Sequence, residues 1–164
     1  MAKFKVVSMG TFRTLVDLES VEQVIWQMLL KDKYTDALVG EYATNASNTL
    51  FNNLPKNKFL PVKSIFMECF TDLFSSIDIE FNPVEDTKLW TQQHSLSKPF
   101  DDSILFLNSV GKKYPICLTS DTTDDMLGTL KHMYDFDYIF TSERLGSYKV
   151  NADGRFFLKL SNIM

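Results

Sequence analysis

The chain has 164 residues, of which 45% are hydrophobic and 23% charged, and this composition excludes a disordered, collagen-like or coiled-coil protein. Seventeen basic against 21 acidic side chains give a formal net charge of −4, so we expect no nucleic-acid partner. The apolar run in the opening segment MAKFKVVSMG is too short for a signal peptide or a membrane span. We therefore expect a cytoplasmic protein that makes no membrane contact.

Three short runs of β-type residues are separated by helical patterns, at 4–9, 114–119 and 137–142. The first run is nearly continuous in apolar residues, as strands buried on both faces are, and it ends at Gly10. Asp124 and Asp125 favour a helix start between the second and third runs. Because strand, helix and strand follow one another, the pattern predicts a parallel βαβ unit with a right-handed crossover.

The middle of the chain shows helical periodicity instead of strand-like runs. Ser20 and Gln23 form a capping-box pattern that predicts a helix start. An apolar stripe over residues 62–77 predicts a second helix. Asn82 followed by Pro83 predicts the N-cap and first residue of another helix.

These patterns predict an α/β fold with a Rossmann-like parallel sheet and an inserted helical cap. The boundaries of the inserted cap lie near Leu18 and Pro99. They divide the chain into an α/β core, residues 1–17 plus 99–164, and a helical insertion, residues 18–98, which follows the first strand.

Three segments resemble the motifs of the haloacid dehalogenase-like (HAD-like) hydrolase superfamily. Residues 6–17, VVSMGTFRTLVD, resemble its first motif, a hydrophobic strand that runs into D-x-(D/Y/F)-(G/Q)-T-(L/V). Residues 118–121, LTSD, resemble the second motif, a strand ending in Ser or Thr. Residues 146–150 with 153–157 resemble the third, a Lys followed by a helix with an apolar pair. The order and spacing of these motifs and the presence of a helical cap resemble the C1-capped branch of the superfamily, which includes L-2-haloacid dehalogenases and phosphatases.

The sequence departs from the family at the residue that would carry the chemistry. The resemblance implies a nucleophilic Asp directly after the first strand, which forms a covalent ester or acyl-phosphate. This chain has Gly10 there. Asp17 lies seven residues further on, at the entry to the cap, and its carboxylate could not reach the same point. Phe12 stands where phosphatase members have their second Asp. The dehalogenase branch also has an aromatic residue at this position.

The resemblance also implies a Mg²⁺ site, formed by the nucleophilic Asp, the carbonyl two residues later and an acid in a fourth motif. Gly10 removes the first ligand, and the chain ends without the fourth motif. We expect no cofactor, and Mg²⁺ only if the missing acids are supplied. By family comparison the C-terminal strands of the core are missing, which would leave a sheet edge exposed to self-association or to a partner.

The remaining site residues form half of an anion cradle for a small phosphate or carboxylate ligand. The resemblance assigns Ser120 and Lys149 to the catalytic positions of the second and third motifs. The candidates for ligand contact are Thr11, Phe12, Arg13 and Asp121. Alternatively, Ser120 caps a helix, Lys149 and Arg13 are solvated surface residues, and Asp121 is an acid at a helix start.

The other chemically reactive side chains are interpreted as structural. His94 and His132 lack a carboxylate or cysteine at ligand spacing, so no metal site is expected, and His94 is placed facing solvent or at a helix end. Cys69 and Cys117 are interpreted as buried free thiols. The stripe with Phe66, Phe70 and Phe74 is interpreted as the core of the cap.

Three hypotheses about function follow. The chain is a HAD-like protein without catalytic activity that binds or interacts, or it is a fragment or variant of an active Mg²⁺-dependent hydrolase, or it is an unrelated interaction domain whose motif matches arise by chance. The first two hypotheses share a fold, and the feature that separates them is whether the reading frame beyond Met164 encodes a strand followed by Gly-Asp and a second acid.

Overall fold

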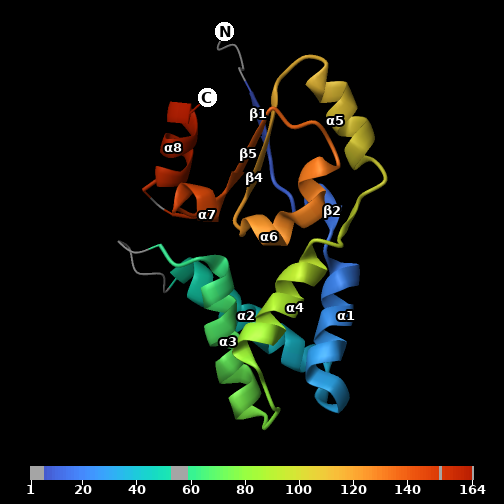
Figure 1. Ribbon diagram of the computed structural model, residues 1–164, viewed down its shortest axis with the longest axis vertical. Coiled ribbons are helices and arrows are strands. Elements are labelled where there is room, and N and C mark those ends of the chain that lie inside the picture. The colour runs from blue at the N-terminus through green and yellow to red at the C-terminus, as the bar shows by residue number, and fades with distance from the viewer. Residues whose placement is uncertain (1–5, 53–58, 152, 164) are drawn as a thin grey trace.

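A parallel sheet of three strands forms the centre of the core (Figure 1). The computed structural model describes residues 6–52, 59–151 and 153–163. The strands are β1 (Val7–Met9), β4 (Ile116–Ser120) and β5 (Tyr138–Thr141), in the order β1-β4-β5. Met9 lies opposite Leu118, and Ser120 lies opposite Thr141. The predicted α/β class and the parallel βαβ unit are confirmed.

The central strand β4 is buried along its whole length and packs on both faces. Ile116 and Leu118 point to a cluster that includes Leu107, Leu127 and Leu130. Cys117, between them, points to the opposite cluster, with Phe156 and Leu160. Because side chains alternate along a strand, one apolar run supplies both layers of the core.

Helices cover the two faces of the sheet (Figure 1). The helical elements of the core are α5 (Ser103–Gly111), α6 (Asp124–Leu127), the 3-10 helix η2 (Gly128–His132), α7 (Ser142–Leu145) and α8 (Arg155–Ile163). The helix predicted after β4 is therefore two short pieces. They meet at Gly128, whose φ of +46° lies in the left-handed region that glycine tolerates best.

The cap consists of helices on the side of the carboxyl ends of the strands (Figure 1). They are α1 (Glu19–Leu30), the 3-10 helix η1 (Lys31–Lys33), α2 (Asp36–Asn52), α3 (Val62–Ser76) and α4 (Pro83–His94). Asn82 is the N-cap of α4, as predicted: its side-chain oxygen accepts hydrogen bonds from two backbone N–H groups, those of Val84 and Glu85.

The predicted capping box at the start of α1 is wrong. Helix α1 begins one residue before Ser20, and the Asp17 carboxylate accepts a 3.0 Å hydrogen bond from the Glu19 N–H. The Asp17 side chain takes the capping role instead, because its carboxylate accepts from an N–H group at the helix start and no Ser hydroxyl is needed.

Aromatic side chains fill the interior of the cap. Phe70 and Phe74 are buried and stack with their ring centroids 5.8 Å apart. Trp26 packs edge-on against Phe70 and against Tyr42, at 5.6 Å and 4.5 Å. The prediction that the Phe stripe forms the cap core holds for Phe70 and Phe74, which belong to this cluster.

A short antiparallel pair connects the cap to the core. It joins β2 (Val16–Asp17) to β3 (Lys98–Pro99), with Val16 opposite Pro99. The expected boundary at 17/18 falls at the end of β2, and the one at 98/99 falls within β3. The Ser103 hydroxyl donates a 2.8 Å hydrogen bond to the Leu15 carbonyl, which fixes the start of α5 beside β2.

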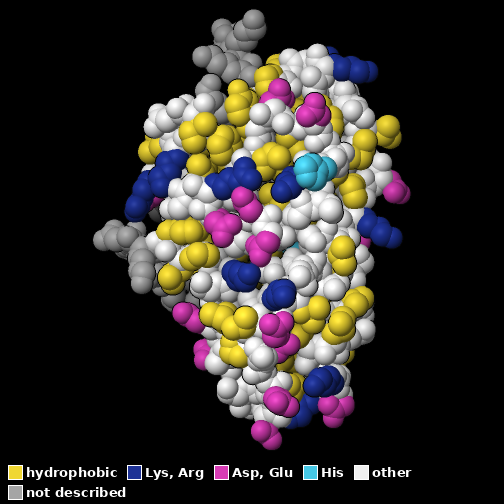
Figure 2. Space-filling view, in the orientation of Figure 1, with side chains coloured by type: hydrophobic (Ala, Val, Ile, Leu, Met, Phe, Trp, Pro, Cys, Tyr) yellow, Lys and Arg dark blue, Asp and Glu magenta, His cyan; other side chains and the backbone are white. Residues whose placement is uncertain are grey.

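The described surface is mixed in charge, and Figure 2 shows basic and acidic side chains interspersed on the face that it presents. Among the residues that the structure describes, no helix combines the length and the apolar character needed to cross a bilayer.

Candidate functional site

A cleft of about 530 Å³ lies between the cap and the loops that follow β1 and β4. Open α/β sheets bind ligands at the carboxyl ends of their strands, which is where this cleft lies. Its lining includes the three candidates Phe12, Arg13 and Asp121. The other lining residues are Leu18, Glu22, Trp26, Asp36, Val39, Gly40, Tyr42, Ala43, Val62, Phe66, Trp90, His94 and Met126.

The loop after β1 turns tightly, and two of its residues, Phe12 and Arg13, line the cleft. The Thr11 carbonyl accepts hydrogen bonds from three N–H groups, including those of Leu15 and Val16 at 2.8 and 3.2 Å. Arg13 has φ +59°, an uncommon conformation for a residue other than glycine. Thr11 was expected to contact a ligand, but it is buried and does not line the cleft.

Gly10 occupies the end of β1, directly after Met9. A Cβ atom added there would lie 2.9 Å from the Thr14 Oγ1, so a larger residue requires the Thr14 side chain to move. Ser8 and Thr119 share a 3.0 Å hydrogen bond between their hydroxyls, which links β1 to β4 near this position.

An ion pair closes one side of the cleft. The Arg13 guanidinium donates to the Glu22 carboxylate at 2.6 Å, with the Arg13 side chain 62% exposed and that of Glu22 22% exposed. Burial raises the pKa of the Glu22 carboxyl above its usual value, although the adjacent Arg13 charge acts in the opposite direction. The pair joins the loop after β1 to helix α1, and its partly exposed Arg limits its contribution to at most about 1 kcal/mol.

The second-motif loop is tied to Lys149. The Asp121 carboxylate accepts a 2.8 Å hydrogen bond from the Lys149 N–H, and the Lys149 Nζ lies 3.5 Å from the Thr119 carbonyl. Burial raises the pKa of Asp121, while Lys149 opposes this shift. Lys149 is thus partly buried at the end of β4 rather than a freely solvated surface residue, and the structure brings it together with Asp121.

Ser120 and Asp121 do not start the helix that follows β4. Ser120 is buried as the last residue of β4, whereas Thr123 is the N-cap residue of α6. Asp124 and Asp125 occupy the first turn of α6, as predicted. The alternative in which Ser120 caps this helix is therefore wrong, and Asp121 is a side chain of the cleft rather than an acid of the helix start.

His94 is buried at the C-terminal end of α4, so the helix-end placement is confirmed and the solvent-facing one is wrong. Its Nδ1–H donates to the Trp90 carbonyl at 2.7 Å. Its ring packs edge-on against Phe12, with the centroids 5.5 Å apart. Burial lowers the pKa of His94 to about 4, despite the hydrogen bond to Trp90, so the imidazole is neutral at pH 7.

The cap side of the cleft is aromatic. Trp26, Tyr42, Phe66 and Trp90 all belong to the lining, and the Trp26 and Trp90 rings lie 5.2 Å apart. Phe66 therefore contributes to the cleft as well as packing on the cap core. The Tyr42 hydroxyl and the Trp90 Nε1 are both buried without a hydrogen-bond partner among the described residues.

The remaining functional residues of the cleft could not be assigned from the sequence. Trp26 and Tyr42 are separated by 15 residues and belong to different helices, and no motif connects them to residues 10–13. Their aromatic character predicts a core position, which both occupy. Glu22 carried one usable signal: it lies three residues before Ile25, one of the residues that mark the buried face of α1, so it points to the same side of the helix.

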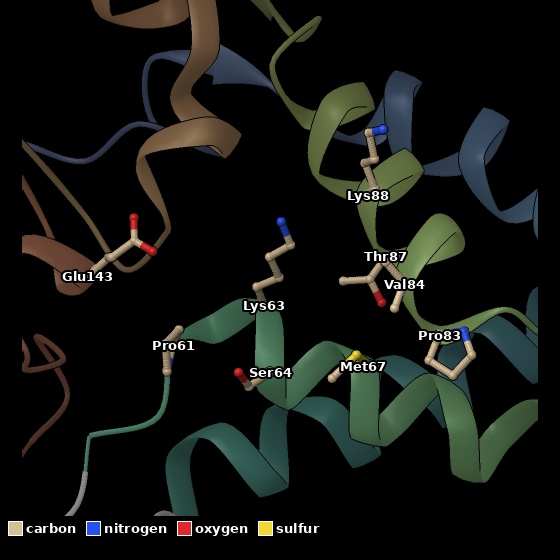
Figure 3. A pocket seen from close by; sticks show the side chains of 9 residues that line it. All are labelled: Pro61, Lys63, Ser64, Met67, Pro83, Val84, Thr87, Lys88 and Glu143. Carbon is tan, nitrogen blue, oxygen red and sulfur yellow. The ribbon is translucent and has the colours of Figure 1, made fainter.

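A second, smaller pocket of about 390 Å³ lies between α3, α4 and α7, and Figure 3 shows its lining. The Lys63 side chain extends from α3 toward the core, with Glu143 on the opposite side (Figure 3). The Lys63 ammonium forms a 3.1 Å ion pair with Asp125, and the Glu143 carboxylate accepts the Asp124 N–H at 2.9 Å. The Lys63 ion pair connects the cap to the start of α6, whereas the Glu143 hydrogen bond joins α7 to α6 within the core.

The described residues do not fit the Mg²⁺ site that the resemblance implies. Hard cations require several oxygen ligands, and Gly10 supplies no carboxylate where the first ligand would be. Within residues 6–52, 59–151 and 153–163, no group of three or more His, Cys, Asp or Glu side chains is placed to hold a metal ion.

Neither Cys69 nor Cys117 forms a disulfide in the described part of the chain, as predicted. Cys117 is buried on β4, and burial raises its pKa to about 11. Cys69 is only partly buried, against the cap core, so the prediction of full burial is wrong for this residue. Neither cysteine lines the cleft.

No family model and no curated protein matches the sequence, but solved structures match the fold. YfnB from Bacillus subtilis, a candidate HAD-hydrolase bound to magnesium, gives a TM-score of 0.79 at 11% identity, over 99% of this chain and 75% of that one. The L-2-haloacid dehalogenase of Xanthobacter autotrophicus with covalently bound chloropropionic acid gives a TM-score of 0.77 at 14% identity, over 99% of this chain and 65% of that one.

The defluorinating L-2-haloacid dehalogenase Rha0230 gives a TM-score of 0.74 at 16% identity, over 97% of this chain and 68% of that one. The chain thus spans 65% to 75% of the length of these three proteins. At such identities the likeness concerns the fold, which confirms the architecture that the three motifs predicted. The chain has the α/β core and the inserted helical cap of the HAD-like hydrolases.

Proposed function

We propose that this chain is a ligand-binding protein on a HAD-like fold, with a cleft that retains a small molecule but not the covalent hydrolase chemistry. The observation that carries the proposal is Gly10 at the end of β1. Glycine has no side chain, so neither pKa tuning nor a rotamer change can supply a nucleophile at that position.

The nearby carboxylates do not replace the missing one. Asp17 lies in β2, and its carboxylate accepts the Glu19 N–H at the start of the cap. Glu22 belongs to α1 and is paired with Arg13. Asp121 faces the cleft, but one of its oxygens accepts the Lys149 N–H. Each of these acids has a structural partner, which supports binding rather than turnover.

An active hydrolase is the second candidate, favoured by the position of the cleft. Lys149 lies at the carboxyl end of β4, and the cap closes over that end of the sheet. An ammonium group there could neutralise a phosphate or carboxylate, as the resemblance implies for the third motif. Such a hydrolase would need a nucleophile other than residue 10.

A turnover assay separates the two candidates. The unaltered chain is incubated with p-nitrophenyl phosphate and Mg²⁺, and separately with 2-chloropropionate, and released nitrophenol and chloride are measured. We expect no product from either substrate, and sustained turnover of either would contradict the proposal. The Gly10→Asp variant tests whether the missing carboxylate alone accounts for inactivity, with Gly10→Ala as the control for the contact with Thr14.

A further inference from the structure

We propose that the open edge of strand β1 pairs with β1 of a second copy of this chain, as an antiparallel strand pair with Ser8 at the two-fold axis. This dimer goes beyond the proposed function, because it uses the edge of the sheet and not the cleft. It gives a strand, a partner and a register to the self-association that the sequence leads us to expect.

Strand β1 has a neighbouring strand on one side only. The sheet has the order β1-β4-β5, so β4 pairs with β1 and no described strand lies on its other side. Ser8 is exposed, and Val7 and Met9 are only partly buried, whereas every residue of β4 is buried. An edge strand presents a row of unpaired N–H and C=O groups to which another strand can bind.

The hydrogen bonds on the β4 side fix which backbone groups of β1 point outward. The Val7 N–H donates to the carbonyl of Pro115, directly before β4, at 2.9 Å. Consecutive residues of a strand direct their N–H and C=O groups to opposite sides, so those of Ser8 point away from β4. The same alternation directs the backbone groups of Val6 and Gly10 outward.

An antiparallel second copy pairs all of these outward groups by symmetry. With Ser8 on the two-fold axis, Ser8 exchanges both backbone hydrogen bonds with Ser8 of the second copy, and Val6 does so with Gly10 of the second copy. Val7 then lies opposite Met9 of the second copy. Because Val7 and Met9 pack against the same apolar cluster, the two copies continue one apolar row across the interface.

The β1 edge lacks the features that protect native edge strands. Residues 6–12 contain no charged side chain and no proline, so two copies meet there without charge repulsion. The other edge of the same sheet is protected by a charge, because the Arg144 guanidinium donates to the Ile139 carbonyl of β5 at 3.2 Å. This contrast favours pairing at β1 rather than at β5.

Sedimentation equilibrium and amide hydrogen exchange test the dimer and its register in the unaltered chain. Because the strand contact is short, we expect a dimer with a Kd on the order of 10–100 µM. We expect the Ser8 N–H to exchange freely in dilute solution and to be protected at least about threefold in concentrated solution. The Val7 N–H, which is bound to the Pro115 carbonyl, should be protected in both.

The Ser8→Pro variant removes the outward N–H and leaves the N–H groups that face β4 in place. Its matched control is Ser8→Ala, which loses the 3.0 Å hydroxyl bond to Thr119 but keeps the N–H. We expect Ser8→Pro to raise the dimer Kd at least about tenfold and Ser8→Ala to raise it less than about threefold. Circular dichroism shows whether each variant is folded, and amide exchange of the unaltered chain decides the question if Ser8→Pro is not.

Three results would overturn the proposal. The first is an unaltered chain that remains a monomer at about 500 µM, well above the expected Kd. The second is a dimer in which the Ser8 N–H still exchanges freely, because another surface then forms the contact. The third is an equal dimer Kd for folded Ser8→Pro and folded Ser8→Ala.

Discussion

The buried His94 makes the stability of the chain depend on pH between about 4 and 6.5. Its pKa is lowered from 6.5 to about 4 in the folded protein. Between these values the unfolded state binds a proton that the folded state does not, so stability is fully present above 6.5 and is lost as the pH falls toward 4. At pH 5, protonation of the unfolded histidine costs the folded state about 2 kcal/mol, and at pH 7 close to zero.

Urea unfolding at pH 7 and pH 5 measures this effect in the unaltered chain and in His94→Gln. The glutamine retains a donor for the Trp90 carbonyl but does not titrate. We expect the unaltered chain to lose about 2 kcal/mol more than His94→Gln between the two pH values. Glu22 and Asp121 titrate in both proteins, so their contributions cancel in this comparison.

The second histidine of the sequence provides the control. His132 is exposed at the end of η2, so the His132→Gln variant controls for the exchange of a histidine for a glutamine away from the cleft. Equal pH dependence of the unaltered chain and His94→Gln would refute the reasoning, because a neutral buried imidazole between cap and core could then not be the titrating group.

Three further predictions follow from burial and capping. Phe70→Ala should lower the free energy of unfolding in urea by about 3–5 kcal/mol, whereas Phe157→Ala, on the exposed side of α8, should change it by less than about 1 kcal/mol. Asn82→Ala removes the acceptor for two N–H groups at the start of α4 and should cost about 1 kcal/mol, measured as a lower melting temperature. A thiol reagent should label Cys69 before Cys117, detected by mass spectrometry of peptides, because burial raises the pKa of Cys117 to about 11; faster labelling of Cys117 would contradict its burial.

The sequence predicted the sheet well because its signals are local. The β-type run at 114–119 predicts a strand, and β4 is buried throughout. The run at 4–9 also contains a strand, but its predicted burial on both faces is wrong, because the residues of β1 are only partly buried or exposed. Asn82 before Pro83 predicted the start of α4 to the residue, since both side chains act on the first turn alone. The end of the second motif was also placed correctly, at the carboxyl end of β4.

Predictions failed where two local signals competed or where the third dimension decided. Ser20 and Gln23 match a capping box, but α1 starts at Glu19, whose N–H donates to the Asp17 carboxylate, so Ser20 lies inside the helix. His94 has a polar neighbourhood in the sequence, yet the core loop with Phe12 covers it. Which residues of a cap helix face the core depends on how the cap docks, and one sequence does not contain that information.

The arrangement of the cleft separates catalysis from binding. The covalent chemistry that the resemblance implies would need a carboxylate at position 10, and Gly10, which follows β1 there, is not among the residues that line the cleft. The walls come from helices of the cap and from residues beyond the turn, so they are held by the aromatic core around Trp26 and Phe70. The proposed binding function therefore depends on a mostly apolar cleft that residues of the cap and of the core form together without Gly10.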